Sequence, residues 1–224
     1  QPIEKVAEIA HAHGMLVIVD AAQGIGHCDI HMEKLGIDIL CFSGHKGLRT
    51  PRGIGAIVMR KAYEIIPLLS GGSGFSSFSK TQPQKLPEHL EAGTLPLELI
   101  ASLQAAIQEK SREDTAKEQE LTHVFMQEAE KIAGVDVLCA SNMQRVPLVS
   151  LRLDRIGSEE AMDILAQEYG ICVRGGIHCA PLLHQQLHSE ETGCLRFSFS
   201  KENTKEEIYQ AISALKSVME DVCE

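Results

Sequence analysis

An acid and a lysine follow two successive apolar runs near the start of the chain. The run at 15–20 ends in Asp20, and the run at 37–43 leads through Gly-His into Lys46. A run that is apolar on both faces is typical of a strand buried in a parallel sheet. Because α/β folds build their sites at the carboxyl ends of parallel strands, we expect both side chains at one edge of a sheet.

These two side chains could bind the two ends of one cofactor. Lysines in pockets form Schiff bases, and a buried carboxylate requires a cationic partner or several hydrogen bonds. Pyridoxal 5'-phosphate (PLP) meets both needs with its aldehyde and its protonated ring nitrogen. The Ser43 hydroxyl, the His45 ring and the small Gly44 would suit its phosphate. Taken singly, an aspartate after a strand is more often a turn or helix cap, and Ser-Gly-His-Lys is more often a solvated turn.

One of the seven cysteines stands in a different setting from the rest. Cys179 lies in a Gly-rich polar loop next to His178, and a reactive thiol needs exposure and a neighbour that can accept or stabilise its proton. A free cysteine in an apolar segment is usually a small buried hydrophobe. We expect that role for the other six, which are Cys28, Cys41, Cys139, Cys172, Cys194 and Cys223.

Two arginines, Arg174 and Arg196, lie on strands expected in the second half of the chain. An internal strand seldom directs an arginine inward without an anion, and the planar guanidinium fork suits an α-carboxylate. A surface ion pair with a glutamate remains an alternative for Arg174, and less so for Arg196.

Two pairs of histidines have the spacing that places both rings on one helix face, His27 with His31 and His184 with His188. Neither pair lies in a His-Glu-x-x-His frame, and no thiolate pairs accompany them. We therefore expect no metal site and assign these histidines to the surface or to packing.

The composition restricts the partners of the protein. A formal net charge of −10 over 224 residues disfavours nucleic acid and an anionic membrane surface. No run of about 18 apolar residues occurs, so no membrane span is expected. The odd number of scattered cysteines, without a Cys-x-x-Cys motif, indicates reduced thiols in a cytoplasmic protein.

The elements that must position these residues follow from the apolar patterns, which indicate an α/β protein with covered sheet faces. Asn203 or Thr204 is the expected cap of the last helix. The expected elements, in chain order, are a helix at 2–13, a strand at 15–20, a short helix at 31–35, strands at 37–43 and 53–60, a functional loop at 70–94, a long helical pattern at 97–132, strands at 135–139 and 146–153, a helix from Ser158, strands at 171–176 and 194–200, and a helix at 203–222.

The order and spacing of several motifs resemble those of a known family. Val-Asp-Ala-Ala-Gln at 19–23, Ser-Gly-His-Lys and Pro-Arg-Gly-Ile-Gly at 51–55 are similar to motifs of the class V aminotransferase group of fold-type I PLP enzymes. Leu-Glu-Ala-Gly-Thr at 90–94 and the segments 173–181 and 195–208 look like the cysteine desulfurase and selenocysteine lyase branch of that group. The resemblance extends over nearly the whole chain.

The resemblance implies a fold and a division into domains. The chain would be the C-terminal part of a fold-type I PLP-dependent transferase, with a mainly parallel sheet in the large domain followed by a smaller α/β domain. Residues 1–108 would belong to the PLP-binding large domain, 109–132 to a connecting helix and 133–224 to the small domain. Members of the family place further elements before the aspartate strand, so we expect this fragment alone to be inactive.

The resemblance also implies roles around the cofactor. Lys46 would carry PLP as an internal aldimine and move protons, and Asp20 would pair with the pyridinium nitrogen. Gln23, which alone carries almost no signal, would hydrogen-bond the ring oxygen. Ser43 and His45 would hold the phosphate, with His45 also counted among the catalytic residues.

Thr94 resembles a threonine that reaches the phosphate of the partner subunit, which implies a homodimer with shared sites. Capping of its own loop is an equally good interpretation of Thr94 from the residues alone.

On the substrate side, Cys179 resembles the family's persulfide-forming cysteine, which attacks the sulfur of a cofactor-bound cysteine and leaves alanine and an enzyme persulfide. Arg196 resembles the arginine that binds the substrate carboxylate, and Arg174 a second active-site arginine. Related enzymes usually have two consecutive histidines before the cysteine, whereas the first of these positions is Ile177 here.

The implied activity is that of a PLP-dependent cysteine desulfurase, which converts L-cysteine to L-alanine and hands sulfur to an acceptor protein, for example in iron–sulfur cluster assembly. Three alternatives stay open. The first is a selenocysteine lyase, the second is another class V reaction such as transamination, and the third is a truncated module without catalysis.

Overall fold

The computed structural model describes residues 1–138 and 145–221 of the chain. The chain divides into two compact units, Gln1–Lys110 and Ser111–Glu224. The residues expected to hold the cofactor lie in the first unit, and the cysteine loop with its two arginines lies in the second.

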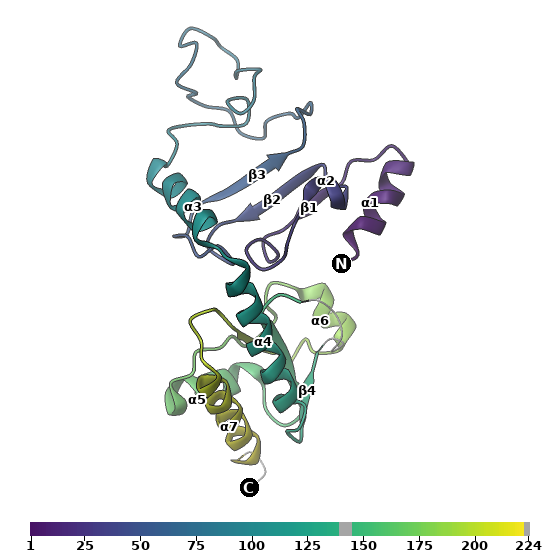
Figure 1. Ribbon diagram of the computed structural model, residues 1–224, viewed down its shortest axis with the longest axis vertical. Helices are drawn as coiled ribbons and strands as arrows, with labels where there is room; N and C mark the ends of the chain where they lie inside the picture. Colours follow the sequence, from purple (N-terminus) through teal and green to yellow (C-terminus); the bar gives the residue numbers. More distant parts are fainter. Residues whose placement is uncertain (139–144, 222–224) are drawn as a thin grey trace. The chain divides into compact units, whose positions relative to one another are not determined.

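A three-stranded mixed sheet, in the order β1-β2-β3, forms the centre of the first unit (Figure 1). β1 (Ile18–Asp20) pairs in parallel with β2 (Ile39–Ser43), so the carboxyl ends of the two strands lie at the same edge, as the sequence predicted. β3 (Gly55–Met59) pairs with β2 in the antiparallel direction. The connection at 44–54 is too short for the crossover that a parallel pair requires.

Two helices, α1 (Ile3–Ala12) and α2 (Met32–Leu35), contribute side chains to the core of this unit. The expectation that the strands are buried on both faces is wrong for β1 and β3, because Ile18 is 63% exposed and Ile57 is 57% exposed. An apolar pattern records what a strand can bury, whereas actual burial depends on the elements packed on each face. Ala21, Ile37 and Leu40 form the buried cluster against which side chains of these helices pack.

Residues 60–96 connect β3 to α3 (Leu97–Glu109) without a helix or strand, which confirms the long loop expected from the Gly, Ser and Pro content (Figure 1). Side chains hold this loop in shape. The two ring nitrogens of His89 lie 2.6 Å from the carbonyl oxygen of Pro83 and 2.8 Å from that of Ile65. These hydrogen bonds give the loop a defined conformation.

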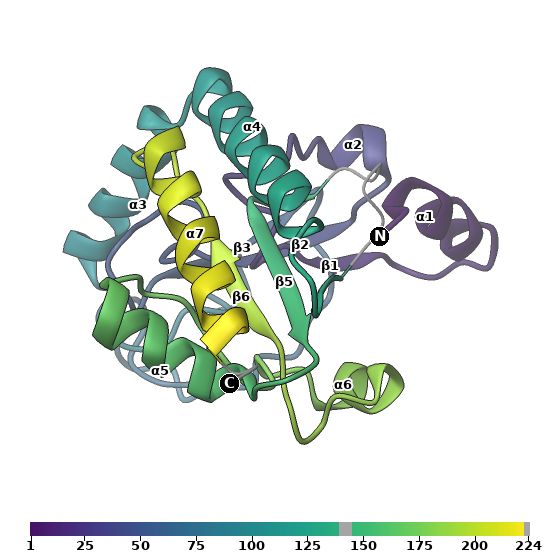
Figure 2. The same ribbon diagram turned by 90° about the horizontal axis from the view of Figure 1, so that it is seen from below.

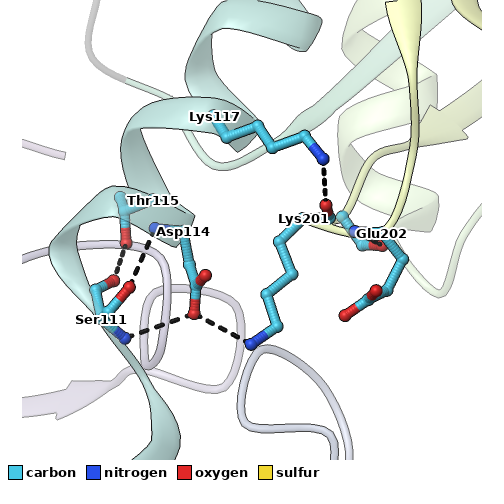
Figure 3. Close-up of polar contacts among 7 residues, drawn as sticks. Ser111, Asp114, Thr115, Lys117, Lys201 and Glu202 are labelled. Atoms are coloured by element: carbon cyan, nitrogen blue, oxygen red, sulfur yellow. Dashed lines mark hydrogen bonds and ion pairs between the residues drawn. The ribbon is translucent and has the colours of Figure 1, made fainter.

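The helical pattern at 97–132 forms two helices, α3 and α4 (Arg112–Ala129), and α4 lies within the stretch 109–132 that was expected as a connecting helix. The second helix, α4, begins with a capping box (Figure 3). The Ser111 hydroxyl accepts from the backbone N–H of Asp114 at 3.1 Å, and the Asp114 carboxylate accepts from the Ser111 N–H at 3.3 Å. The Lys201 ammonium donates to the same carboxylate at 3.1 Å. The Ser-x-x-Asp pattern thus starts a new helix at this point.

The second unit contains an antiparallel sheet in the order β4-β5-β6, covered on one face by α4, α5 and α7 (Figure 2). Helices and sheets together confirm the α/β class, with the described sheets mixed in the first unit and antiparallel in the second. The elements are β4 (Val135–Val137), β5 (Leu148–Leu153), α5 (Ser158–Tyr169), α6 (Pro181–Leu187), β6 (Leu195–Ser198) and α7 (Lys205–Asp221).

Side chains alternate between the two faces of β5 and β6. On β6, Leu195 and Phe197 are buried against the helices, and Arg196 between them belongs to the opposite face. From α4, Leu121 and Phe125 enter the same core. The stretch expected as a connecting helix therefore packs as part of the second unit.

The last helix is capped as the sequence predicted. The Thr204 hydroxyl accepts from the Glu207 N–H at 3.2 Å, and the Glu207 carboxylate accepts from the Thr204 N–H at 2.9 Å. The end of this helix at 222 and the last residue of the strand expected at 135–139 lie outside the described residues.

The expectation of a strand at 171–176 is wrong, because only Arg174 forms a β-bridge there, with Arg196. The chain leaves the sheet at the next residue. Gly175 lies so close to the backbone of Ser158 that a Cβ atom would be 2.5 Å from the Ser158 carbonyl oxygen. The glycines thus direct the chain into the cysteine loop at 175–180.

Candidate active site

Two backbone turns that follow β1 and β2 pack directly against each other. A Cβ atom on Gly26 would lie 2.6 Å from the carbonyl carbon and oxygen of Gly47, and one on Gly47 would collide with the carbonyl oxygen of Ile25. Gly26 also has a φ of +80°, which other residues rarely adopt. This close approach holds the turn after Asp20 against the turn that carries Lys46.

Asp20 stands at the end of β1 and is exposed. Its Oδ1 accepts a hydrogen bond from the backbone N–H of Ala22 at 2.8 Å, so the carboxylate caps the turn. Asp20 therefore caps the turn, which is the alternative that the sequence left open. The same hydrogen bond orients the carboxylate.

The other residues expected around the cofactor have polar groups available for a ligand. Gln23 follows β1 in the same turn as Asp20, while His45 and Lys46 are exposed in the turn after β2. Among the residues that the structure describes, their side chains form no hydrogen bond or ion pair. The same is true of Ser43, which ends β2, and of Thr94.

Thr94 lies in the loop 60–96 and is exposed. Within the described part of the chain, no hydrogen bond joins it to the turns that carry Asp20 and Lys46. The structure therefore brings five of the six expected cofactor residues to the ends of β1 and β2 and the turns that follow them, while Thr94 lies in the loop 60–96.

Cys179 is exposed, and its sulfur atom contacts an arginine. Nη2 of Arg174 lies 3.8 Å from Cys179 Sγ, which is within the range of a hydrogen bond to sulfur. The contact places a positively charged group beside the sulfur atom. The alternative for Arg174, an ion pair with a glutamate, is not found among the described residues.

The expectation that the remaining cysteines are buried is wrong for Cys28 and Cys172, which are exposed. Cys172 lies in the stretch 171–173, where the expected strand does not form, so no sheet buries its side chain. Cys41 is half-buried and Cys194 is buried, and burial raises the pKa of the Cys194 thiol. Cys139 and Cys223 lie outside the described residues.

Arg174 and Arg196 pair across the β-bridge and therefore belong to the same face of the sheet. The Nε of Arg196 is buried and has no hydrogen-bond partner. Burial, and then the charge of Arg174, lower the pKa of Arg196. A buried N–H donor without an acceptor is costly, and an anion bound here would satisfy it.

His178 has a role that its place in the sequence did not reveal. Its Nε2 lies 2.7 Å from the carbonyl oxygen of Cys194, while its Nδ1 is buried without a hydrogen-bond partner. Burial, together with Arg196 and Arg174, lowers the pKa of His178. No local pattern links His178 to Cys194, because the contact depends on how the loop folds back on the sheet.

The histidine pairs form no metal centre among the residues that the structure describes, where no group of three or more possible ligands occurs. His184 is buried, and its Nδ1 lies 2.9 Å from the Ser189 hydroxyl. The His31 ring lies 3.1 Å from the Asp29 carboxylate. In the described chain, no helix is both long enough and apolar enough to cross a membrane.

Comparisons with known proteins show what the chain is similar to. A curated protein of Methanothermobacter thermautotrophicus, named "Probable cysteine desulfurase", is 32% identical over 219 residues, which are 93% of this chain and 54% of that protein. The apo structure of a cysteine desulfurase from Thermococcus onnurineus NA1 has a TM-score of 0.85 at 28% identity, over 98% of this chain and 56% of that one. The cysteine desulfurase CsdA from Escherichia coli has a TM-score of 0.84 at 30% identity, over 97% and 55%.

The chain thus spans about half the length of the relatives that it matches. The sequence profile described as Aminotransferase class-V matches residues 1–210. Because this match includes both turns, the loop at 60–96 and the cysteine loop, the chain belongs to the aminotransferase class-V family.

Proposed function

We propose that the complete protein containing this chain is a PLP-dependent cysteine desulfurase. The observation that carries the proposal is the contact between Arg174 and Cys179, beside an Arg196 guanidinium whose Nε is buried without a partner. This arrangement joins a nucleophilic sulfur to a site for an anion, which is what a reaction on the sulfur of an amino acid requires. Named cysteine desulfurases among the relatives support it.

The residues on the two turns fit PLP chemically. The Lys46 amine would attach the cofactor and move protons at its Nζ, and the Asp20 carboxylate would receive the ring N–H. Gln23, Ser43 and His45 offer donors for the ring oxygen and the phosphate. When bound, PLP withdraws electrons from the substrate's α-carbon. The proposed division is a PLP-binding part at 1–108, a connecting helix at 109–132 and a small domain at 133–224.

On the substrate side, the Arg196 guanidinium would bind the α-carboxylate, with Arg174 beside it. The Cys179 thiolate would attack the sulfur atom of the substrate cysteine. An S–S bond forms as the C–S bond breaks, and the electron pair of the C–S bond stays with the carbon, which is then protonated. The products are alanine and a persulfide on Cys179.

We propose further that the protein is a cytoplasmic homodimer that passes its sulfur to an acceptor protein. Thr94 would contact the phosphate of the cofactor in the partner subunit. The exposure of Thr94 on the loop 60–96 supports this proposal. The free cysteines of the described chain are compatible with a reducing compartment.

The test is an assay of the complete, PLP-loaded protein for alanine formed from L-cysteine, with L-selenocysteine and a transamination donor in parallel. Cys179→Ser is expected to abolish alanine formation from cysteine and to leave the bound PLP in place. The matched control is Cys172→Ser, which replaces another exposed cysteine of the same unit. Full activity of the Cys179→Ser variant would refute the proposal, and keto-acid formation without alanine would favour transamination.

A further inference from the structure

The cysteine loop is attached to the start of β6 by both backbone groups of one residue. The Cys194 N–H donates to the carbonyl oxygen of Gly176 at 3.0 Å, and the Cys194 carbonyl oxygen lies 2.7 Å from Nε2 of His178. We call this set, Gly176, His178 and Cys194, the Cys194 clamp. One of its two hydrogen bonds comes from a side chain, that of the residue directly before Cys179.

The tautomer of His178 follows from its partner. A carbonyl oxygen can only accept, so Nε2 must carry the hydrogen and donate it. In the neutral ring, Nδ1 then carries a lone pair, and this atom is buried without a partner. Burial and the two neighbouring arginines lower the pKa of His178, so the neutral ring with a hydrogen on Nε2 is the favoured form.

The clamp holds a backbone conformation that is unfavourable by itself. His178 has a φ of +54° and Cys179 a φ of +61°, both in the left-handed region. This conformation costs non-glycine residues roughly 1–2 kcal/mol each, so it persists only where other contacts impose it. At the beginning of the same segment, Arg174 exchanges two backbone hydrogen bonds with Arg196. Cys179 therefore directly follows a segment, 174–178, that is attached at two points to β6 and to the residue before it.

We propose that His178 is the positioning residue of Cys179: its hydrogen bond to the Cys194 carbonyl keeps the strained turn closed and Cys179 Sγ within reach of the Arg174 guanidinium. Without this bond, the turn relaxes and the thiolate loses its cationic neighbour. The importance of this positioning for catalysis rests on the proposed function. The effect of His178 on the position of the Cys179 thiol does not.

The test is the rate at which iodoacetamide alkylates Cys179 in the full chain without PLP, followed by peptide mass spectrometry at pH 7. The amide nitrogen of Gln can take the place of Nε2, whereas the shorter Asn cannot reach the Cys194 carbonyl. We expect His178→Gln to alkylate within about twofold of the unchanged chain and His178→Asn on the order of tenfold more slowly. His123→Asn, on the exposed side of α4, is the matched control and is expected to have no effect.

A double variant separates positioning from a general loss of structure. In an Arg174→Met background, His178→Asn is expected to slow alkylation by less than about twofold, because its effect acts through the contact that is already gone. Equal rates for the Gln and Asn variants, or a full tenfold effect in the Arg174→Met background, would overturn the proposal. The alkylation rates are measured without PLP and do not depend on desulfurase activity. A negative result in the desulfurase assay would therefore refute the proposed function without refuting the positioning role of His178.

Discussion

Arg174 and Arg196 lie opposite each other across an antiparallel β-bridge, with their backbone N–H groups donating to each other's carbonyl oxygens at 3.2 and 2.7 Å. Directly opposed like charges are destabilising in a sheet. Within the part of the chain that the structure describes, neither guanidinium has an acidic partner. A bound anion would relieve this repulsion, which makes the pair a natural site for a carboxylate.

The first prediction concerns the shape of the Arg196 guanidinium. In the complete, PLP-loaded protein, we expect Arg196→Lys to lower kcat/KM for cysteine roughly 10- to 150-fold, because a hydrogen bond to a charged group contributes about 1.5–3 kcal/mol and lysine lacks the planar fork. The effect should lie mainly in KM. Arg152→Lys is the matched control, since Arg152 is on the same sheet and pairs with Asp136 at 2.6 Å. Unchanged kinetics of Arg196→Lys would contradict the assigned role.

The second prediction concerns Lys46, whose exposed ammonium has no partner among the described residues. Borohydride reduction of the complete protein with PLP should attach the cofactor to the peptide that contains Lys46, as mapped by mass spectrometry. Lys46→Arg should abolish the label, because arginine forms no Schiff base. Lys61→Arg is the control, and it should leave the label unchanged. A label that survives Lys46→Arg would place the attachment elsewhere.

The third prediction concerns a buried carboxylate away from the site. Asp38 accepts hydrogen bonds from the Val17 N–H at 2.9 Å, from Nε2 of His11 at 2.8 Å, from Arg60 at 2.6 Å and from the Tyr63 hydroxyl at 2.8 Å. Replacement of Asp38 by Asn leaves these donors without their anion and should cost about 3–5 kcal/mol of the free energy of unfolding. Hydrogen exchange of the amides in β1 and β2 would measure the loss within this unit.

The matched control is Asp29→Asn, which removes an exposed carboxylate that contacts His31 and should cost less than about 1 kcal/mol. A loss as small for Asp38→Asn as for Asp29→Asn would show that the Asp38 contacts contribute little.

The same carboxylate predicts a dependence of stability on pH. The hydrogen bond from Val17, and then those from His11 and Tyr63 and the charge of Arg60, hold the pKa of Asp38 well below its ordinary value. The stabilisation is therefore fully present above the unfolded-state pKa of about 3.9 and is lost as the pH falls below it. Urea unfolding between pH 6 and pH 3 should become easier in the unchanged chain, and this component should be absent in Asp38→Asn. An identical acid dependence in both would contradict the assignment.

The fourth prediction concerns the start of α4. Asp114→Ala removes the capping box with Ser111 and the contact with Lys201 (Figure 3), and it should cost about 1 kcal/mol of the stability of the second unit. Glu113→Ala is the control, because Glu113 is an exposed acid in the same helical turn and caps nothing. The readout is hydrogen exchange in the first turn of α4, and equal effects of the two substitutions would contradict the prediction.

The parts of the fold that the sequence predicted depend on local patterns. Asp20 and Lys46 follow apolar runs whose strands pair in parallel, so their common edge could be expected from the pattern and the fold class together. Thr204 could be expected as a cap because both residues of the capping box, Thr204 and Glu207, lie within four consecutive positions. The equivalent pattern of Ser111 and Asp114 was present as well, and it would have revealed the break between α3 and α4.

The parts that the sequence did not predict depend on contacts between distant segments. Asp38 lies in an apolar strand pattern, and its four partners come from two other stretches of the chain, 11–17 and 60–63. The clamp of His178 on Cys194 forms only when the cysteine loop folds back onto β6. Likewise, the exposure of Ile18 and Cys172 depends on which elements cover them, and periodicity carries no information about that.

The measurement that tests the central claim most directly is the mapping of sulfur on the complete, PLP-loaded protein after brief exposure to isotopically labelled L-cysteine. Alkylation followed by peptide mass spectrometry would locate any persulfide. The account predicts one labelled sulfur atom on Cys179, none on the exposed Cys28 and Cys172, and none anywhere after Cys179→Ser. Alanine formed with no labelled sulfur on Cys179, or with the label on another cysteine, would contradict it.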